Sequence, residues 1–125
     1  EYIPGLKDLE GFSHIILLYV FDRNRKGEYK LHVEPFLDGE KRGVFSTRAP
    51  RRPNNIGLSV VKVEKIMNNT IFFSGADMLD NTPLLDIKPF VPEFDFGEAF
   101  RIGWLEGKIK ISEKRKADDR FSQAE

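Results

Sequence analysis

The chain has 125 residues, a length that holds one domain around one hydrophobic core. Its 20 Lys and Arg residues balance 20 Asp and Glu residues, so a globally basic coat for nucleic acid is excluded and a local basic patch is not. The absence of cysteine excludes a disulfide scaffold, a zinc–thiolate site and a thiol nucleophile. The longest apolar run, Ile15–Phe21, is too short to span a bilayer, and nothing resembles a signal peptide. We therefore expect a soluble, cytoplasmic domain.

Strands are predicted over most of the chain, at residues 13–22, 29–36, 58–67, 70–76 and 107–111. The first of these segments is an almost continuous run of branched and aromatic residues, which is typical of a strand buried on both faces. Asn68 and Asn69 separate the third segment from the fourth and predict a hairpin, because asparagine tolerates the positive φ of a tight turn. No window shows a sustained helical period, so the sequence predicts a mainly-β barrel.

Two long segments between these strands are rich in proline and polar residues, 48–57 and 77–92. Their prolines exclude a regular helix interior, so we expect loops. Loops of this length in a small domain are usually functional. Residues 112–125 are highly charged and are expected to form a frayed or disordered tail. The expected organisation is a domain over 1–111 followed by this tail.

Basic residues cluster in a stretch of twelve residues that contains no acid: Lys41, Arg42, Arg48, Arg51 and Arg52. The planar fork of arginine pairs two phosphate oxygens at once, so the cluster is a candidate site for phosphate or nucleic acid. A solvated loop paired with acids elsewhere is the alternative. Phe45 lies within the cluster, where it could stack on a base, but a buried strand position is the interpretation that the sequence favours.

Acidic residues suggest two further features. Asp77, Asp80 and Asp86 could hold magnesium or act in acid–base chemistry, but capping of turns is favoured, and we expect no metal. Residues 80–83 are predicted to form a tight turn that presents N–H groups and a carboxylate to a polar small molecule, such as a ribose or an amino-acid ammonium. Asp22 and Arg23 follow the first strand, where they could orient a ligand or accept a proton, or form an exposed ion pair.

Three motifs resemble those of the TsaA-like domain family, in the family's order. They are GLKDLEGFSH at 5–14 with LYVF at 18–21, RGVFSTR at 42–48 with RRPNNIGLS at 51–59, and DMLDNTPLLDIKP at 77–89. The family also has an N-terminal strand and a Pro-Arg-Gln-like segment, and neither is visible in this sequence. Asn55 stands where proline is usual in the family, and Asn81 where glycine is usual.

The resemblance implies a TrmO-type tRNA (adenine-N6)-methyltransferase in a short, single-domain form. Such enzymes transfer a methyl group from S-adenosyl-L-methionine to N6 of threonylcarbamoyladenosine, next to the anticodon of threonine tRNA. The family fold is a single-sheeted β-barrel, and its members are typically homodimers.

The resemblance also assigns roles to residues. The cofactor-binding positions that it implies are Asp22, Arg23, Arg48, Leu58, Asp80, Asn81, Thr82 and Pro83. Asp22, which stands where many members carry histidine, is the candidate acceptor of the N6 proton. The residues expected at the anticodon loop are Lys41, Arg51, Arg52 and Asn54.

Three alternatives stay open at this point. The first is a non-catalytic RNA-binding barrel with a vestigial cofactor site. The second is a methyltransferase of the same fold with another substrate. A metal-dependent hydrolase that uses the aspartates is the most distant of the three.

Overall fold

A computed structural model of the chain describes residues 1–23, 28–35, 39–95 and 101–108. The strands in this part of the chain are β1 (His14–Val20), β2 (His32–Val33), β3 (Arg42–Gly43), β4 (Ile56–Met67), β5 (Thr70–Ser74) and β6 (Leu84–Pro89). The helices within the described residues are short, namely the 3₁₀ turns η1 (Ile3–Leu6), η2 (Leu9–Gly11), η3 (Val44–Ser46) and η4 (Gly103–Leu105) and one α-helical turn, α1 (Pro92–Asp95). The prediction of a mainly-β protein is therefore confirmed. None of the helices in the described residues has the length and apolar character of a membrane span.

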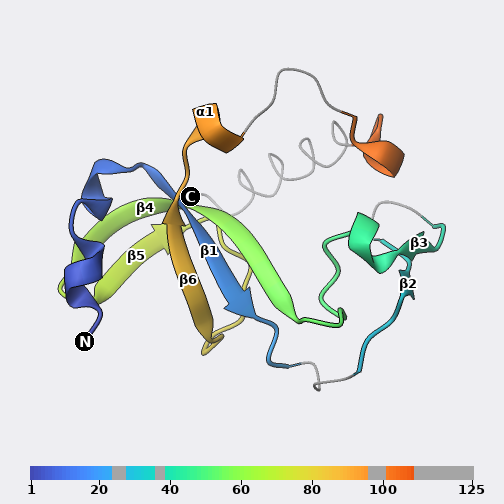
Figure 1. The fold of residues 1–125 in the computed structure, drawn as a ribbon, viewed down its shortest axis with the longest axis horizontal. Coiled ribbons are helices and arrows are strands. Elements are labelled where there is room, and N and C mark those ends of the chain that lie inside the picture. The colour runs from blue at the N-terminus through green and yellow to red at the C-terminus, as the bar shows by residue number, and fades with distance from the viewer. Residues whose placement is uncertain (24–27, 36–38, 96–100, 109–125) are drawn as a thin grey trace, which may run out of the picture.

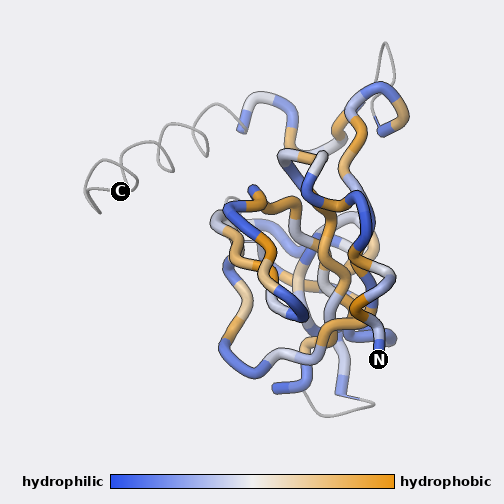
Figure 2. The backbone as a smooth tube through the Cα atoms, turned by 90° about the vertical axis from the view of Figure 1, so that its left-hand side faces the viewer, coloured by the Kyte–Doolittle hydropathy of each residue, from blue (hydrophilic) through white to orange (hydrophobic). Residues whose placement is uncertain are grey.

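One antiparallel sheet with the order β5-β4-β1-β6 forms the body of the molecule (Figure 1). The shorter pair of β2 and β3 lies to one side of it, together with η3. The apolar segments gather in the body of the sheet, and much of the hydrophilic chain lies in the connecting loops (Figure 2). Among the described residues β5 and β6 are the two edges of the sheet, so the closed barrel that the sequence predicts is not confirmed.

The central strand β1 is buried on one face only. Ile15, Leu17 and Tyr19 are buried, whereas the residues that alternate with them are half-buried. The prediction of a strand buried on both faces is wrong here, because the face opposite the core is only partly covered. That face, which we call the outer face, continues across β4, where Leu58 and Val60 are 45% and 40% exposed.

The core lies on the other face, which we call the inner face. Ile15, Leu17, Tyr19 and Val61 form its buried centre. Residues 75–83 connect β5 to β6, and Ala76 and Met78 in this segment pack against that centre. This connection fixes where β6, and the turn that precedes it, lie relative to β1.

The β4–β5 hairpin forms at the two asparagines, as predicted. Met67 pairs with Thr70, and Asn68 has a φ of 53°, in the left-handed region that asparagine tolerates. The predicted segments 58–67 and 70–76 correspond closely to the two strands of this hairpin.

β6 is a strand that the sequence did not predict, since it falls within the segment 77–92 that we expected to be a loop. Pro83 precedes this strand and Pro89 ends it. Proline cannot donate to a sheet ladder, but it is compatible with the ends of an edge strand, and β6 is such a strand.

Two other predicted strands are not seen as expected. Within the predicted segment 29–36, the structure describes residues 29–35, and of these His32 and Val33 form a strand. Of residues 107–111, Gly107 and Lys108 lie in a turn after η4. The rest of that segment and the tail 112–125 lie outside the described residues.

Gly57 allows the tight packing at the end of β1. It pairs with Tyr19, and a Cβ at this position would lie 2.4 Å from Cε2 of Tyr19 and 2.8 Å from Cζ of Phe21. The rings of Tyr19 and Phe21 meet edge to face with their centroids 5.5 Å apart. The absence of a side chain at Gly57 therefore lets the rings of Tyr19 and Phe21 pack directly over the backbone of β4.

We expect Gly57→Ala to lower the free energy of unfolding by about 1–3 kcal/mol, the usual cost of forcing an atom into a packed core. Urea denaturation measures this change. Gly11→Ala is the matched control, since a Cβ at Gly11 has nothing within 4 Å. Equal stability of the Gly57→Ala protein and the wild type would contradict the close contact of Tyr19 with β4.

Candidate cofactor and RNA site

The C-terminal end of β1 joins the second and third sequence motifs. The backbone N–H of Val20 donates to the carbonyl of Pro83 over 3.0 Å, and that of Phe21 donates to the carbonyl of Asn55 over 2.7 Å. Residues 83 and 55 belong to the turn before β6 and the loop before β4, respectively. Segments that are far apart in the sequence therefore meet where β1 ends.

Arg23 contacts the predicted turn directly. Its Nη2 donates to the carbonyl oxygen of Asp80 over 2.8 Å, across 57 residues of sequence. The tight turn that the sequence predicts at 80–83 is present, but it lies one residue earlier, at 79–82: Asn81 has a φ of 64°, and the N–H of Thr82 donates to the carbonyl of Leu79 over 3.3 Å. Asparagine accepts this conformation more readily than most residues do, so the turn forms without glycine.

A hollow of about 840 Å³ adjoins this turn. Leu79, Asp80, Asn81 and Thr82 line one part of it, and Lys62, Glu64 and Phe73 from the sheet line another. Its size lies within the usual range for a small-molecule site, and its lining mixes carboxylate, hydroxyl and apolar groups.

The other cofactor residues implied by the resemblance lie elsewhere around this end of the sheet. Leu58 pairs with Leu18, and it belongs to the partly exposed outer face of the sheet. Asp22 and Arg48 are both exposed, and within the described residues neither forms a hydrogen bond to the turn. Of the implied cofactor residues, Asp80, Asn81 and Thr82 line the hollow. Arg23 reaches the turn through the carbonyl of Asp80 but does not line the hollow, and neither do Asp22, Arg48, Leu58 and Pro83.

The basic residues form a loop that Arg52 holds together. Nη1 of Arg52 donates to the carbonyls of Thr47 and Ala49 over 2.9 and 3.0 Å, and its backbone N–H donates to Oδ1 of Asn55 over 3.4 Å. These bonds close residues 47–55 into a compact loop. Lys41, Arg48, Arg51 and Asn54 are exposed, whereas Arg52 is half-buried.

Phe45 lies within the basic cluster 41–52, just before this loop, but not in a strand. It is in η3, and its side chain is 74% exposed. The prediction of a buried strand residue is wrong because the chain turns at Val44–Ser46, which buries Val44 and directs the next residue outward.

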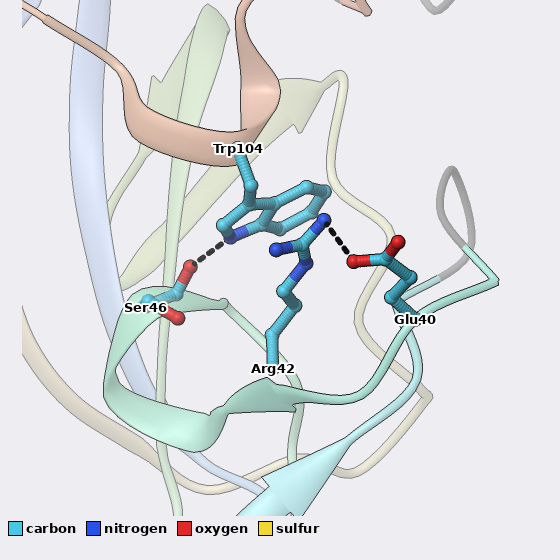
Figure 3. A network of polar contacts seen from close by, with 4 residues as sticks. All are labelled: Glu40, Arg42, Ser46 and Trp104. Carbon is cyan, nitrogen blue, oxygen red and sulfur yellow. Dashed lines mark hydrogen bonds and ion pairs between the residues drawn. The ribbon is translucent and has the colours of Figure 1, made fainter.

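Trp104, in η4, connects the last described residues to η3 and β3 (Figure 3). Its Nε1 donates to the carbonyl of Ser46 over 2.8 Å. The guanidinium of Arg42 lies 5.7 Å from the centre of its ring, and Arg42 in turn pairs with Glu40 at 3.1 Å. The sequence motifs did not single out Trp104. The signal available was that it is the one tryptophan of the chain, next to a highly charged segment.

The aspartates do not assemble into a metal site in the described residues. No group of three or more acidic or histidine side chains there is placed to hold an ion. Asp86 instead pairs with Lys88 at 2.9 Å. The hydrogen bond from Lys88, together with one from the N–H of Ile87, lowers the pKa of Asp86 below its ordinary value.

Comparisons with known proteins agree with the sequence motifs. The tRNA-methyltransferase O N-terminal domain family matches residues 1–96. A probable S-adenosyl-L-methionine-binding protein of Pyrococcus abyssi is 55% identical over 122 residues, which are 97% of this chain and 65% of that protein. The mouse tRNA (adenine(37)-N6)-methyltransferase is 50% identical over 92 residues, 73% of this chain and 21% of the enzyme.

A solved structure shows the same arrangement. The crystal structure of TrmO from Pseudomonas aeruginosa matches with a TM-score of 0.65 and 39% identity, over 82% of this chain and 42% of that one. The chain therefore spans about two thirds or less of the length of these relatives. Motifs, sequence identity and fold agree, and the chain belongs to the tRNA-methyltransferase O N-terminal domain family.

Proposed function

We propose that the protein is an S-adenosyl-L-methionine-dependent tRNA (adenine-N6)-methyltransferase. The observation that carries this proposal is the meeting of three segments at the end of β1. There Arg23 contacts the Asp80–Pro83 turn, and Phe21 bonds to the loop that holds the basic residues. A cofactor site and a phosphate-binding surface are thereby close enough to serve one reaction.

The residues at the turn fit this cofactor. The carboxylate of Asp80 suits the ribose hydroxyls or the ammonium group of the methionine moiety. Asn81, Thr82 and Pro83 supply the turn that wraps it. Arg23 holds the backbone of the turn through the carbonyl of Asp80, so the shape of the site is set before ligand arrives. The roles of Leu58 as an apolar contact and of Arg48 as a residue lining the cofactor are proposed on the family resemblance alone, since neither lines the hollow.

The cofactor supplies a methyl group that its sulfonium already activates. The protein then has to align the acceptor nitrogen and assist the loss of its proton. Asp22, next to Arg23 at the end of β1, is the proposed acceptor of the N6 proton. In the proposed substrate, threonylcarbamoyladenosine next to the anticodon of threonine tRNA, N6 is also a urea nitrogen. Its lone pair is delocalised, so removal of the proton matters more than for a simple amine.

The basic loop is the proposed contact with the anticodon loop. Lys41, Arg51 and Asn54 are exposed and available to phosphate oxygens. Arg52 uses Nη1 within the protein, and the remaining N–H donors of its guanidinium suit a phosphate. A target base is most easily splayed out of its stack in such a loop of tRNA.

The finer structural expectations are part of the same proposal. A single-sheeted barrel is supported by the resemblance and by an antiparallel sheet with a core on one face. A homodimer is supported by the partly exposed apolar residues on the outer face of β1 and β4. Action on tRNA fits a cytoplasmic location.

Asp80→Ala should weaken the binding of S-adenosyl-L-methionine at least tenfold, because it removes the carboxylate of the turn. Isothermal titration calorimetry with the full chain measures this affinity. Asp86→Ala is the matched control, since Asp86 is also an exposed aspartate of the third motif but does not line the hollow. Wild-type affinity in the Asp80→Ala protein would exclude this turn as the cofactor site.

Arg51→Ala should weaken the binding of threonine tRNA and reduce the slope of log K against log salt by about one, the value expected for one phosphate contact. Filter binding at a series of salt concentrations gives both quantities. Lys7→Ala, a loss of the same charge at an exposed position in the first sequence motif, should leave the slope unchanged. An unaltered slope for Arg51→Ala would remove Arg51 from the RNA-binding surface.

A further inference from the structure

Phe45 is exposed in a way that folding does not explain. It is a large aromatic side chain with 74% of its surface open to solvent, and a buried position for such a group is favourable. Its neighbour Val44 is 1% exposed, so the turn does anchor itself in the protein. The Phe45 ring is therefore not needed to anchor η3 in the protein.

The backbone under this ring is held at several points. The N–H of Thr47 donates to the carbonyl of Val44 over 3.1 Å, and the hydroxyl of Thr47 donates to the same carbonyl over 2.8 Å. The hydroxyl of Ser46 donates to the carbonyl of Gly43 over 2.7 Å. From the other side, Trp104 donates to the carbonyl of Ser46 (Figure 3). A turn fixed in this way presents Phe45 with little loss of backbone freedom on binding.

The ring is also flanked by fixed positive charge. The guanidinium carbon of Arg52 lies 5.9 Å from the centre of the Phe45 ring. Because Arg52 is tied to Thr47 and Ala49, that charge cannot move far from the ring. Arg51 is exposed on the same loop, and residues 41–52 contain no acid.

We propose that Phe45 stacks on a nucleobase of the RNA that the basic loop binds. An exposed aromatic ring among arginines is the combination that recognises single-stranded nucleic acid, in which the ring takes a base and the cations take the phosphates. The absence of acidic residues from 41–52 argues against a positively charged or zwitterionic partner. This inference rests on the proposed function, and it adds to that function a contact with a base rather than with the backbone.

The test compares Phe45 variants in binding to an anticodon stem–loop of threonine tRNA that carries 2-aminopurine in the loop. Phe45→Ala should bind about 5- to 100-fold more weakly. Its salt slope should equal that of the wild type, because no phosphate contact is lost. Phe45→Trp should keep the affinity of the wild type and the change in 2-aminopurine fluorescence that the wild type gives on binding. Phe45→Leu should keep neither. Phe94→Ala is the control, since Phe94 is also highly exposed but lies in α1.

The experiment distinguishes failure of the stacking role from failure of the proposed function. Wild-type affinity of Phe45→Ala or Phe45→Leu, while the wild type binds the stem–loop, overturns the stacking role and leaves the proposed function standing. A Phe45→Ala protein that changes its oligomeric state in sedimentation overturns it too, because the ring would then contact another copy of the chain. Failure of the wild type to bind the stem–loop overturns both proposals.

Discussion

Two backbone hydrogen bonds at the end of β1 organise the functional end of this molecule. The N–H groups of Val20 and Phe21 donate to the carbonyls of Pro83 and Asn55, in the turn before β6 and the loop before β4. Each bond connects β1 to a segment that belongs to another sequence motif. Both residues are half-buried, and backbone N–H groups shielded from water need partners, so these bonds hold both segments in place as long as the sheet is intact. The proposed cofactor turn and the basic loop therefore adjoin the end of the same strand.

Near the end of β1, polar side chains hold the backbone of the loops through hydrogen bonds to carbonyl oxygens. Arg23 donates to the carbonyl of Asp80, Arg52 to two carbonyls of its own loop, and Trp104 to that of Ser46. These donors act on loops that contain little regular secondary structure of their own. Loops held in this way keep their binding groups in position before a ligand arrives, which lowers the entropy lost on binding. A charged residue in such a loop can thus serve the fold and the function together, as Arg52 does in the proposed RNA-binding surface.

The features that the sequence predicts correctly depend on local chemistry. The strand at His14–Val20 follows from its branched and aromatic residues, and the turns at Asn68 and Asn81 follow from the tolerance of asparagine for positive φ. Features that depend on distant partners were missed. The strand Leu84–Pro89 is stabilised by pairing with β1. Its flanking prolines made this segment look like a loop in the sequence. The exposure of Phe45 and the partial exposure of the outer face depend on what packs against them, and a linear pattern does not contain that information. The motifs identified the family, but only the structure showed that Arg23 bonds to Asp80.

The most direct test of the proposed function is a methyl-transfer assay with labelled S-adenosyl-L-methionine and the full chain. Threonine tRNA with and without the threonylcarbamoyl group serves as the pair of substrates. We expect transfer of label to the modified tRNA alone, and loss of transfer in the Arg23→Ala protein, whose turn is no longer held. Cofactor and tRNA binding without transfer to either RNA would contradict the proposed reaction and favour a different substrate. Absence of both cofactor binding and transfer would contradict the site itself and favour an RNA-binding domain without catalytic activity.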